Sequence, residues 1–203
     1  MREVVLATRN QGKIREITEC LRDLDIVIYS LNDFPATSAV KEDGKNFREN
    51  ALKKARYLAD FTGKVALADD SGLEVEALGG KPGVLSARFA GDKASDQDNN
   101  KKLLEHLKGF PLGRRGASFR CVLALAEPSG QEIVIEETCQ GVILLQERGG
   151  EGFGYDPLFF FPPLNKTFAE LTREEKNQVS HRGKALRKLK EALRVRGPKP
   201  SPQ

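Results

Sequence analysis

Residues 64–75 read KVALADDSGLEV, and this stretch decides the fold predicted for the chain. Lys64 to Ala68 is a short, β-rich apolar run, which predicts a buried strand. Four residues that favour turns follow it: Asp69, Asp70, Ser71 and Gly72. Strand character returns at Leu73 to Val75. Ligands bind where the strands of open α/β sheets end, so we expect a site at this acidic segment.

The two adjacent carboxylates allow two interpretations. Neighbouring side chains of an extended segment point in opposite directions, so one aspartate can face a site while the other anchors the loop. Mg²⁺ prefers one or two carboxylates together with substrate phosphates, and a carboxylate beside a bound water can act as a base. An ordinary turn is the alternative, because Asp, Ser and Gly all favour turns. The local pattern leaves both interpretations open.

Strands and helices alternate on both sides of this segment. The run Glu3 to Thr8 predicts a strand, and RNQGK then leads into a helix whose apolar face carries Ile14, Ile17, Leu21 and Leu24. Further strands are predicted at 26–29, 118–126, 132–137 and 142–145. Further helices are predicted at 47–59, at 95–107, after the Thr172/Glu175 capping box, and after Ser180. Residues 31–45 predict a long loop, and 128–130 a hairpin turn.

Length and composition fit this pattern. The 203 residues are 39% hydrophobic, which suits one compact α/β domain or two small lobes around a shared sheet. We expect a single domain over residues 1–196 and a disordered tail over 197–203, where GPKP ends regular structure. No run of eighteen apolar residues and no signal-peptide pattern occurs, so we expect a cytoplasmic protein without membrane contact.

The charge and the cysteines exclude other classes of protein. The net charge is +4, from 33 basic and 29 acidic residues, a mixture too even for wrapping nucleic acid along a broad face. The three cysteines lack C-x-x-C spacing, which argues against a zinc cluster or a disulfide framework. A local site for an anionic substrate remains compatible with this composition.

Three further polar segments contain residue types that bind ligands. Residues 8–13 (TRNQGK) place a glycine and a lysine at a helix start, where free N–H groups favour phosphate, although a helix-start turn with a solvated lysine fits as well. Residues 149–157 (GGEGFGYDP) combine glycines with aromatics that could stack on a base, or form a tight turn. Residues 180–184 (SHRGK) place cations at a helix start, which is unfavourable unless an anion or acceptor compensates.

Six motifs in order resemble the signature of the inosine triphosphate pyrophosphatase family, from Val4 to about Leu193. They are T-x-N-x-G-K at 8–13, F-x-E-N-A-x-x-K-A at 47–55, A-D-D-S-G-L at 68–73, L-G-G-x-P-G-x-x-S-A-R at 78–88, F-G-Y-D-P-x-F at 153–159 and L-T-x-E-E-K-x-x-x-S-H-R-G at 171–183. The resemblance implies an α/β fold with an elongated mixed central sheet, flanking helices, and two lobes around a nucleotide-binding cleft. It also implies a homodimer that uses Mg²⁺.

The resemblance also implies residue roles. Asp70 would be the general base and a metal ligand, with Glu42 as the second metal carboxylate and Lys13 and Lys54 as catalytic cations near the phosphates. From the adjacency of the two aspartates at a strand end, we expect Asp69 to be mainly structural or auxiliary. The substrate contacts would be Thr8, Arg9, Asn10, Gln11, Gly12, Lys13, Ser71, Phe153, Gly154, Tyr155, Asp156, Lys176, His181 and Arg182. The first six of these would hold the triphosphate, and those from Phe153 onward would surround the base and sugar.

The implied reaction converts non-standard purine triphosphates (ITP, dITP, XTP) to the monophosphate and pyrophosphate. Donors such as His181 and Arg182 would recognise the 6-oxo group that adenine lacks; the sequence does not explain how guanine is excluded. A salt bridge from these two residues to Glu174 or Glu175 is the structural alternative. The functional alternatives are a pyrophosphatase for modified pyrimidine nucleotides, a nucleotide-binding regulatory module, and a nucleic-acid-binding protein using the basic C-terminal helix. Paired carboxylates argue against the last two, because they repel phosphates unless a metal intervenes.

Overall fold

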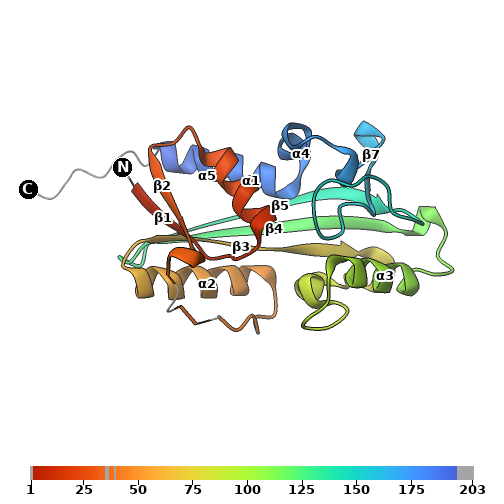
Figure 1. The fold of residues 1–203 in the computed structure, drawn as a ribbon, viewed down its shortest axis with the longest axis horizontal. Coiled ribbons are helices and arrows are strands. Elements are labelled where there is room, and N and C mark those ends of the chain that lie inside the picture. The colour runs from red at the N-terminus through yellow and green to blue at the C-terminus, as the bar shows by residue number, and fades with distance from the viewer. Residues whose placement is uncertain (1, 35–36, 39, 196–203) are drawn as a thin grey trace, which may run out of the picture. The chain divides into compact units, whose positions relative to one another are not determined.

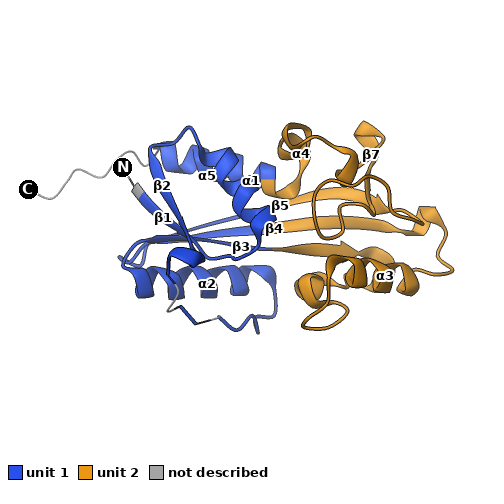
Figure 2. Ribbon diagram, in the orientation of Figure 1, with its two compact units in different colours: residues 1–70, 122–136, 183–203 blue, residues 71–121, 137–182 orange. Residues whose placement is uncertain are grey.

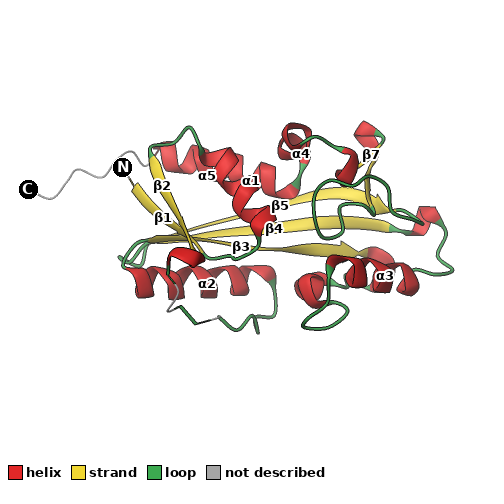
Figure 3. Cartoon of the chain, in the orientation of Figure 1, coloured by secondary structure: helices red, strands yellow, loops and turns green. Residues whose placement is uncertain are grey.

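The computed structural model describes residues 2–34, 37–38 and 40–195, so the predicted tail at 197–203 lies outside the described residues. Figures 1 and 3 show its helices and strands. The helices are α1 (Gln11–Leu21), α2 (Phe47–Thr62), α3 (Asp96–His106), α4 (Arg173–Val179) and α5 (His181–Val195). The strands are β1 (Arg2–Leu6), β2 (Ile26–Ser30), β3 (Val65–Val75), β4 (Gly116–Ala126), β5 (Glu132–Ile143), β6 (Phe159–Phe161) and β7 (Lys166–Thr167).

The strands form one seven-stranded mixed sheet in the order β2-β1-β3-β4-β5-β6-β7. β1 pairs in parallel with both β2 and β3, with Val4 opposite Ile28 on one side and Val65 on the other. β6 pairs antiparallel with β5 and β7. The hairpin predicted at 128–130 joins the neighbours β4 and β5, and the Glu127 N–H donates to the Gln131 carbonyl at 2.9 Å. The predicted α/β class with a mixed sheet and flanking helices is therefore confirmed.

The chain divides into two compact units, shown in Figure 2. Unit 1 comprises Met1–Asp70, Val122–Glu136 and Gly183–Gln203, and unit 2 comprises Ser71–Cys121 and Glu137–Arg182. The division passes through β3, β4 and β5, so each of these strands contributes residues to both units. Among the described residues, no helix has the length and apolar character needed to cross a membrane.

Unit 1 is a layered arrangement of helices on strands. α1 and α5 cover one face of its strands and α2 covers the other (Figure 1). Asn46 caps α2 by accepting a hydrogen bond from the Glu49 N–H, and Gly63 ends the helix in the left-handed conformation at φ 65°. The apolar stripe that the sequence predicted for α2 is buried at five of its six residues, while Leu52 is only partly buried: the five are Phe47, Ala51, Ala55, Leu58 and Ala59.

Unit 2 has an aromatic core. The Phe119 ring lies 4.6 Å from Phe159 and 5.7 Å from Phe168, measured between ring centroids. Leu103 and Leu107 of α3 belong to the same buried cluster, which fixes that helix against the aromatic rings. Aromatic pairs at these separations add packing energy beyond the burial of their area. The core therefore holds α3 and the strands of unit 2 as one body.

Two predictions of strand boundaries are wrong. β3 runs without a break through Asp69–Gly72, although the sequence predicted that the strand ends at Ala68, because both acidic side chains pair with lysines along an extended backbone. The strands predicted at 132–137 and 142–145 are one strand, β5. Gly141 lies inside β5 because an aromatic ring approaches it: a Cβ added there would lie 2.5 Å from the Phe159 ring and 2.6 Å from the Phe160 carbonyl oxygen.

Gly141→Ala tests this close approach. The added methyl group overlaps a backbone oxygen that cannot shift freely, so we expect the free energy of unfolding to fall by about 2 kcal/mol. Denaturant unfolding measures the change. Gly113→Ala is the matched control, since a Cβ at that position meets nothing within 4 Å, and it should leave stability unchanged or slightly raised. Equal stabilities for the two variants would contradict the close approach of Phe159 and Phe160 to Gly141.

Candidate active site

Lys54 is the centre of a charged cluster in unit 1. Its Nζ donates to Asp70 Oδ1 at 2.7 Å, to Glu42 Oε1 at 2.8 Å and to the Asp69 carbonyl oxygen at 3.1 Å. Lys54 and Asp70 are buried, and the Glu42 side chain is 31% exposed. A solvated helix lysine, the alternative allowed by the sequence, is therefore wrong for Lys54. The structure brings the two predicted metal carboxylates onto one ammonium group.

The cluster shifts the pKa values of its members. Burial alone would lower the pKa of Lys54, but the Asp70 and Glu42 carboxylates outweigh burial and the pKa is raised, so the ammonium stays charged at neutral pH. Burial raises the pKa of Asp70 above its usual value, against the opposing effects of Lys54 and Lys13. A carboxylate with a raised pKa is a better proton acceptor than an ordinary aspartate.

Asp69 pairs with a lysine from the helix on the other face of β3. Its Oδ1 lies 2.6 Å from Lys13 Nζ, and its side chain is fully buried. Lys13 comes from α1 and Lys54 from α2, and these helices lie on opposite faces of the strand (Figure 1). The alternation expected of adjacent strand residues therefore divides the two aspartates between two lysines. This pairing fits the structural role predicted for Asp69.

The segment 8–13 forms the start of α1. Asn10 is the N-cap, and its Oδ1 accepts a hydrogen bond from the Lys13 N–H at 3.0 Å, while the Asn10 N–H donates to Thr8 Oγ1 at 3.2 Å. Gln11 and Gly12 occupy the first helical turn, so their N–H groups have no partner within the helix. Arg9 is exposed. This geometry is suited to an anion, since helix N-termini attract negative charge.

The residues at Lys54 fit a magnesium ion. Asp70 and Glu42 present hard oxygen donors within one hydrogen bond of the same nitrogen, and Mg²⁺ takes one or two carboxylates plus phosphate oxygens and waters. Within the described part of the chain, no group of three or more His, Cys, Asp and Glu side chains could hold a metal alone. A metal here would therefore depend on substrate oxygens to complete its coordination.

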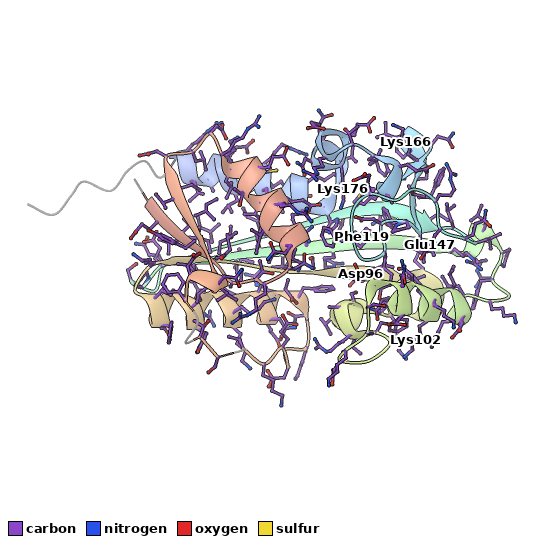
Figure 4. All side chains as sticks on the ribbon, in the orientation of Figure 1. Asp96, Lys102, Phe119, Glu147, Lys166 and Lys176 are labelled. Carbon is purple, nitrogen blue, oxygen red and sulfur yellow. The ribbon has the colours of Figure 1, made fainter. Side chains whose placement is uncertain are left out.

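A second charged cluster lies in unit 2. Asp156 Oδ2 accepts a hydrogen bond from Lys176 Nζ at 2.6 Å and another from the Phe153 N–H at 2.9 Å. Lys176 Nζ also lies 4.7 Å from the centroid of the Phe153 ring, within range of a cation–π interaction. Lys176 and Asp156 are both buried. The ion pair therefore fixes the partly exposed Phe153 ring. Figure 4 labels Lys176, on α4.

Arg182 and His181 are held by different contacts. Arg182 donates to Ser71 Oγ at 2.8 Å, and its guanidinium lies 5.5 Å from the Phe153 ring centroid. The His181 ring stacks on Phe119 at 4.7 Å between centroids. Of the two acids named in the structural alternative, Glu174 and Glu175, the second accepts from Lys166 at 2.9 Å and from the Thr172 N–H at 2.8 Å. The predicted residues Ser71, Phe153 and Arg182 are thus brought together.

The Tyr155 side chain is held by a hydrogen bond inside unit 2. Its side chain is buried in the core of unit 2, and its hydroxyl donates to the Ser86 carbonyl at 2.8 Å. Burial raises the pKa of the hydroxyl, which stays protonated. The hydroxyl is thus fixed within unit 2, and the substrate contact expected of Tyr155 stays a prediction. Gly154 has φ 62°, and this left-handed conformation places the chain between Phe153 and Tyr155 as only glycine readily allows.

Sequence reasoning missed three residues beside these clusters. Phe119 stacks on His181, and nothing in the pattern of β4 distinguishes it from an ordinary core aromatic. Asn50 lies one helical turn before Lys54, and its Oδ1 accepts from the Gly44 N–H at 2.8 Å, which holds the loop that carries Glu42. Its position four residues from Lys54 was a usable signal. Asp96 accepts a hydrogen bond from the Gly154 N–H at 2.6 Å.

Comparison with known proteins places the chain in a family. A family model described as the Ham1 family matches residues 4–192. A dITP/XTP pyrophosphatase of Desulforamulus reducens is 54% identical over 191 residues, which cover 94% of this chain and 95% of that protein. The chain belongs to the Ham1 family. A Ham1 relative from Geobacter sulfurreducens, also named dITP/XTP pyrophosphatase, is 54% identical over 97% of this chain and 99% of its own length. The family resemblance inferred from the six motifs is confirmed.

Solved Ham1 structures have the same fold. The Coxiella burnetii HAM1 protein matches with a TM-score of 0.88 at 44% identity, covering 96% of this chain and 100% of that one. A structure named nucleoside-triphosphatase / dITP/XTP pyrophosphatase, from Mycobacterium abscessus, matches with a TM-score of 0.76 at 44% identity, covering 92% of this chain and 98% of that one. The α/β fold with its seven-stranded sheet is therefore a Ham1 fold.

Lys176→Met tests the buried pair in unit 2. The substitution leaves the Asp156 carboxylate buried with the loss of its cation, so we expect the free energy of unfolding to fall by about 3 kcal/mol. Lys166→Met is the matched control, because the Lys166–Glu175 pair is 41% and 37% exposed and its loss should cost less than about 1 kcal/mol. Denaturant unfolding compares the two variants. If Lys176→Met lowered the free energy of unfolding no more than Lys166→Met, the buried Lys176–Asp156 pair would not stabilise unit 2 as we expect.

Proposed function

We propose that this Ham1 protein hydrolyses dITP, XTP and ITP to the monophosphate and pyrophosphate, which removes non-standard purines from the nucleotide pool. Its relatives named dITP/XTP pyrophosphatase support this, at 54% identity over nearly their whole length. The observation that carries the proposal is the cluster in which Lys54 binds Asp70 and Glu42, because it joins a phosphate-binding cation to a candidate base. Water attacks the α-phosphorus in this reaction and pyrophosphate leaves.

Unit 1 binds and polarises the triphosphate in this proposal. The N–H groups at the start of α1 and the ammonium groups of Lys13 and Lys54 donate to phosphate oxygens. Negative charge builds up on the departing pyrophosphate, so donors that strengthen their contacts in the transition state lower the barrier. Lys13 exchanges part of its contact with Asp69 for a phosphate oxygen. The Asp69 carboxylate keeps the lysine close to that position beforehand.

Asp70 accepts the proton of the attacking water. Its raised pKa makes it a stronger base, and the Lys54 ammonium holds its Oδ1 in place through the 2.7 Å bond. A magnesium ion bound by Asp70 and Glu42 would supply positive charge that offsets the repulsion between these carboxylates and the phosphates. Lys54 would keep the two carboxylates oriented toward each other.

Unit 2 recognises the purine in this proposal. The Phe153 ring offers a stacking surface beside Lys176 and Arg182, which are hydrogen-bond donors. A 6-oxo group is an acceptor that these donors and His181 can satisfy, whereas the 6-amino group of adenine is a donor. A site that hydrogen-bonds a substrate acceptor rejects analogues that lack it, since its donors would be left unpaired. Guanine also carries a 6-oxo group, so discrimination against guanine must depend on the substituent at the 2-position of the purine.

Other features stay as predictions. A homodimer and a two-lobed nucleotide cleft are implied by the family resemblance, and a single domain over 1–196 and a cytoplasmic location by the sequence pattern. Sedimentation velocity measures the oligomeric state directly. The functional alternatives are hydrolysis of modified pyrimidine triphosphates, nucleotide binding without turnover, and nucleic-acid binding. A panel of nucleotide substrates separates these alternatives from the proposed function.

A substrate panel is the direct test. With Mg²⁺ present, ITP, dITP and XTP should release pyrophosphate with kcat/KM about a hundredfold above that for ATP, CTP and UTP, and GTP should also be poor. EDTA should abolish the reaction and added Mg²⁺ restore it. Release of orthophosphate alone, preference for a modified pyrimidine, or binding without turnover would each contradict the proposal.

Asp70→Asn tests the base. The amide cannot accept the proton, so kcat should fall by about a hundredfold or more while the fold is kept. In the unsubstituted protein, kcat/KM should rise with pH as Asp70 loses its proton, and this acid limb should lie above the usual aspartate pKa of 3.8 because the pKa is raised. Asp43→Asn is the matched control in the same loop as Glu42; Asp43 binds Lys53 on the surface and should be dispensable. Near-normal turnover in Asp70→Asn would exclude the role.

A further inference from the structure

The loop 153–156 in unit 2 is held at every residue by the side chains of that unit. The Phe153 N–H donates to Asp156 Oδ2 at 2.9 Å, and the Tyr155 hydroxyl donates to the Ser86 carbonyl at 2.8 Å. Asp156 is itself fixed by Lys176 at 2.6 Å. These contacts account for three of the four residues, and the fourth is Gly154.

Gly154 is held on both sides of its backbone by α3. Its N–H donates to Asp96 Oδ2 at 2.6 Å, and its carbonyl accepts from Asn100 Nδ2 at 3.2 Å. Asp96 and Asn100 are four residues apart, so they share one face of α3 a single turn apart. A carboxylate acceptor makes the first bond charge-assisted, which strengthens it.

The two hydrogen bonds that join Gly154 to Asp96 and Asn100, called the clamp below, are anchored more firmly than a surface contact. Asn100 is buried and also donates to Glu147 Oε1 at 2.9 Å, so the amide is fixed from a second segment. Figure 4 labels Asp96 and Glu147, the outer members of this chain of contacts. Leu103, one turn further along α3, lies in the aromatic core cluster of unit 2. The position of Gly154 is therefore tied to the core through α3.

We propose that Asp96 and Asn100 are positioning residues for base specificity, acting through Gly154 on the orientation of Phe153. The proposal rests on the proposed function, in which Phe153 stacks on the purine. Neither side chain needs to touch the nucleotide. Gly154 has φ 62°, and without its two partners this glycine can change its backbone dihedral angles between the contacts that hold its neighbours, which alters the orientation of the adjacent Phe153 ring. Selection of a 6-oxo purine requires the ring and the donors beside it to hold one geometry.

Asp96→Ala breaks the clamp at an exposed position, where the fold should survive. The ITP/ATP ratio of kcat/KM should fall about tenfold, which is the scale of one lost charge-assisted hydrogen bond. Asp96→Asn keeps an acceptor for the Gly154 N–H and should restore most of the ratio. Asn100→Ala should change the ratio in the same direction as Asp96→Ala.

Asp98→Ala is the matched control. Asp98 lies on the same helix, but it completes the capping box with Ser95 at 2.9 Å and makes no bond to Gly154. It should lower stability through loss of the cap and leave the ITP/ATP ratio unchanged. A fall in the ratio equal to that of Asp96→Ala would mean that helix stability, not the clamp, sets specificity, and would overturn the proposal.

Hydrogen exchange of residues 153–156 supplies a readout that does not depend on activity. Exchange of the Gly154 and Phe153 amides should be faster in Asp96→Ala than in the unsubstituted protein, and unchanged in Asp98→Ala. Unchanged exchange in Asp96→Ala would overturn the clamp itself. Faster exchange with an unaltered ITP/ATP ratio would overturn its role in specificity. Failure of the unsubstituted protein to hydrolyse ITP would instead refute the proposed function, and the exchange result would still decide whether the clamp exists.

Discussion

A buried lysine ammonium must be neutralised where it lies, and Lys54 imposes this constraint on unit 1. Removing a charge from water costs several kcal/mol unless opposite charges and hydrogen bonds compensate. Asp70 and Glu42 supply those charges, and the Asp69 carbonyl supplies a third acceptor. The same ammonium allows two carboxylates to approach each other, which would otherwise raise the pKa of one of them further. α2, β3 and the loop carrying Glu42 are thus held together by one nitrogen atom.

The continuity of β3 follows from this requirement. Asp69 and Asp70 serve lysines on α1 and α2, which lie on opposite faces of the strand, and only an extended backbone sends adjacent side chains in opposite directions. A turn at this point would put both carboxylates on one side and leave one lysine without its counter-charge. The most polar part of the strand is therefore as regular as its apolar part, because charge pairing holds it.

The sequence pattern correctly predicted the features that depend on residues close together in the chain. The apolar stripe of α2 and the hairpin at 128–130 are set by neighbours in sequence, and both were predicted. The predicted end of the strand at Ala68 was wrong because turn preference is local, whereas the lysine that pairs with Asp69 lies 56 residues away. Tyr155 depends on a distant partner in the same way: its hydroxyl donates to the Ser86 carbonyl, 69 residues away. The motifs identified which residues matter, but the partner of each could be known only from the fold.

The two units hold their site residues by different physical means. Unit 1 uses charges that compensate one another, so in the proposed function its lysines and carboxylates can change partners when phosphates bind. In unit 2 the backbone N–H groups of Phe153 and Gly154 donate to the carboxylates of Asp156 and Asp96, and the binding of a base in the proposed function need not change these bonds. Recognition of one exocyclic oxygen needs fixed donors, since a donor that can swing away also accommodates the wrong base. Phosphate binding tolerates adjustment because charge acts over distance, whereas discrimination between bases does not. In the proposed function, this difference in tolerance is the reason why the loop beside Phe153 is held by so many hydrogen bonds.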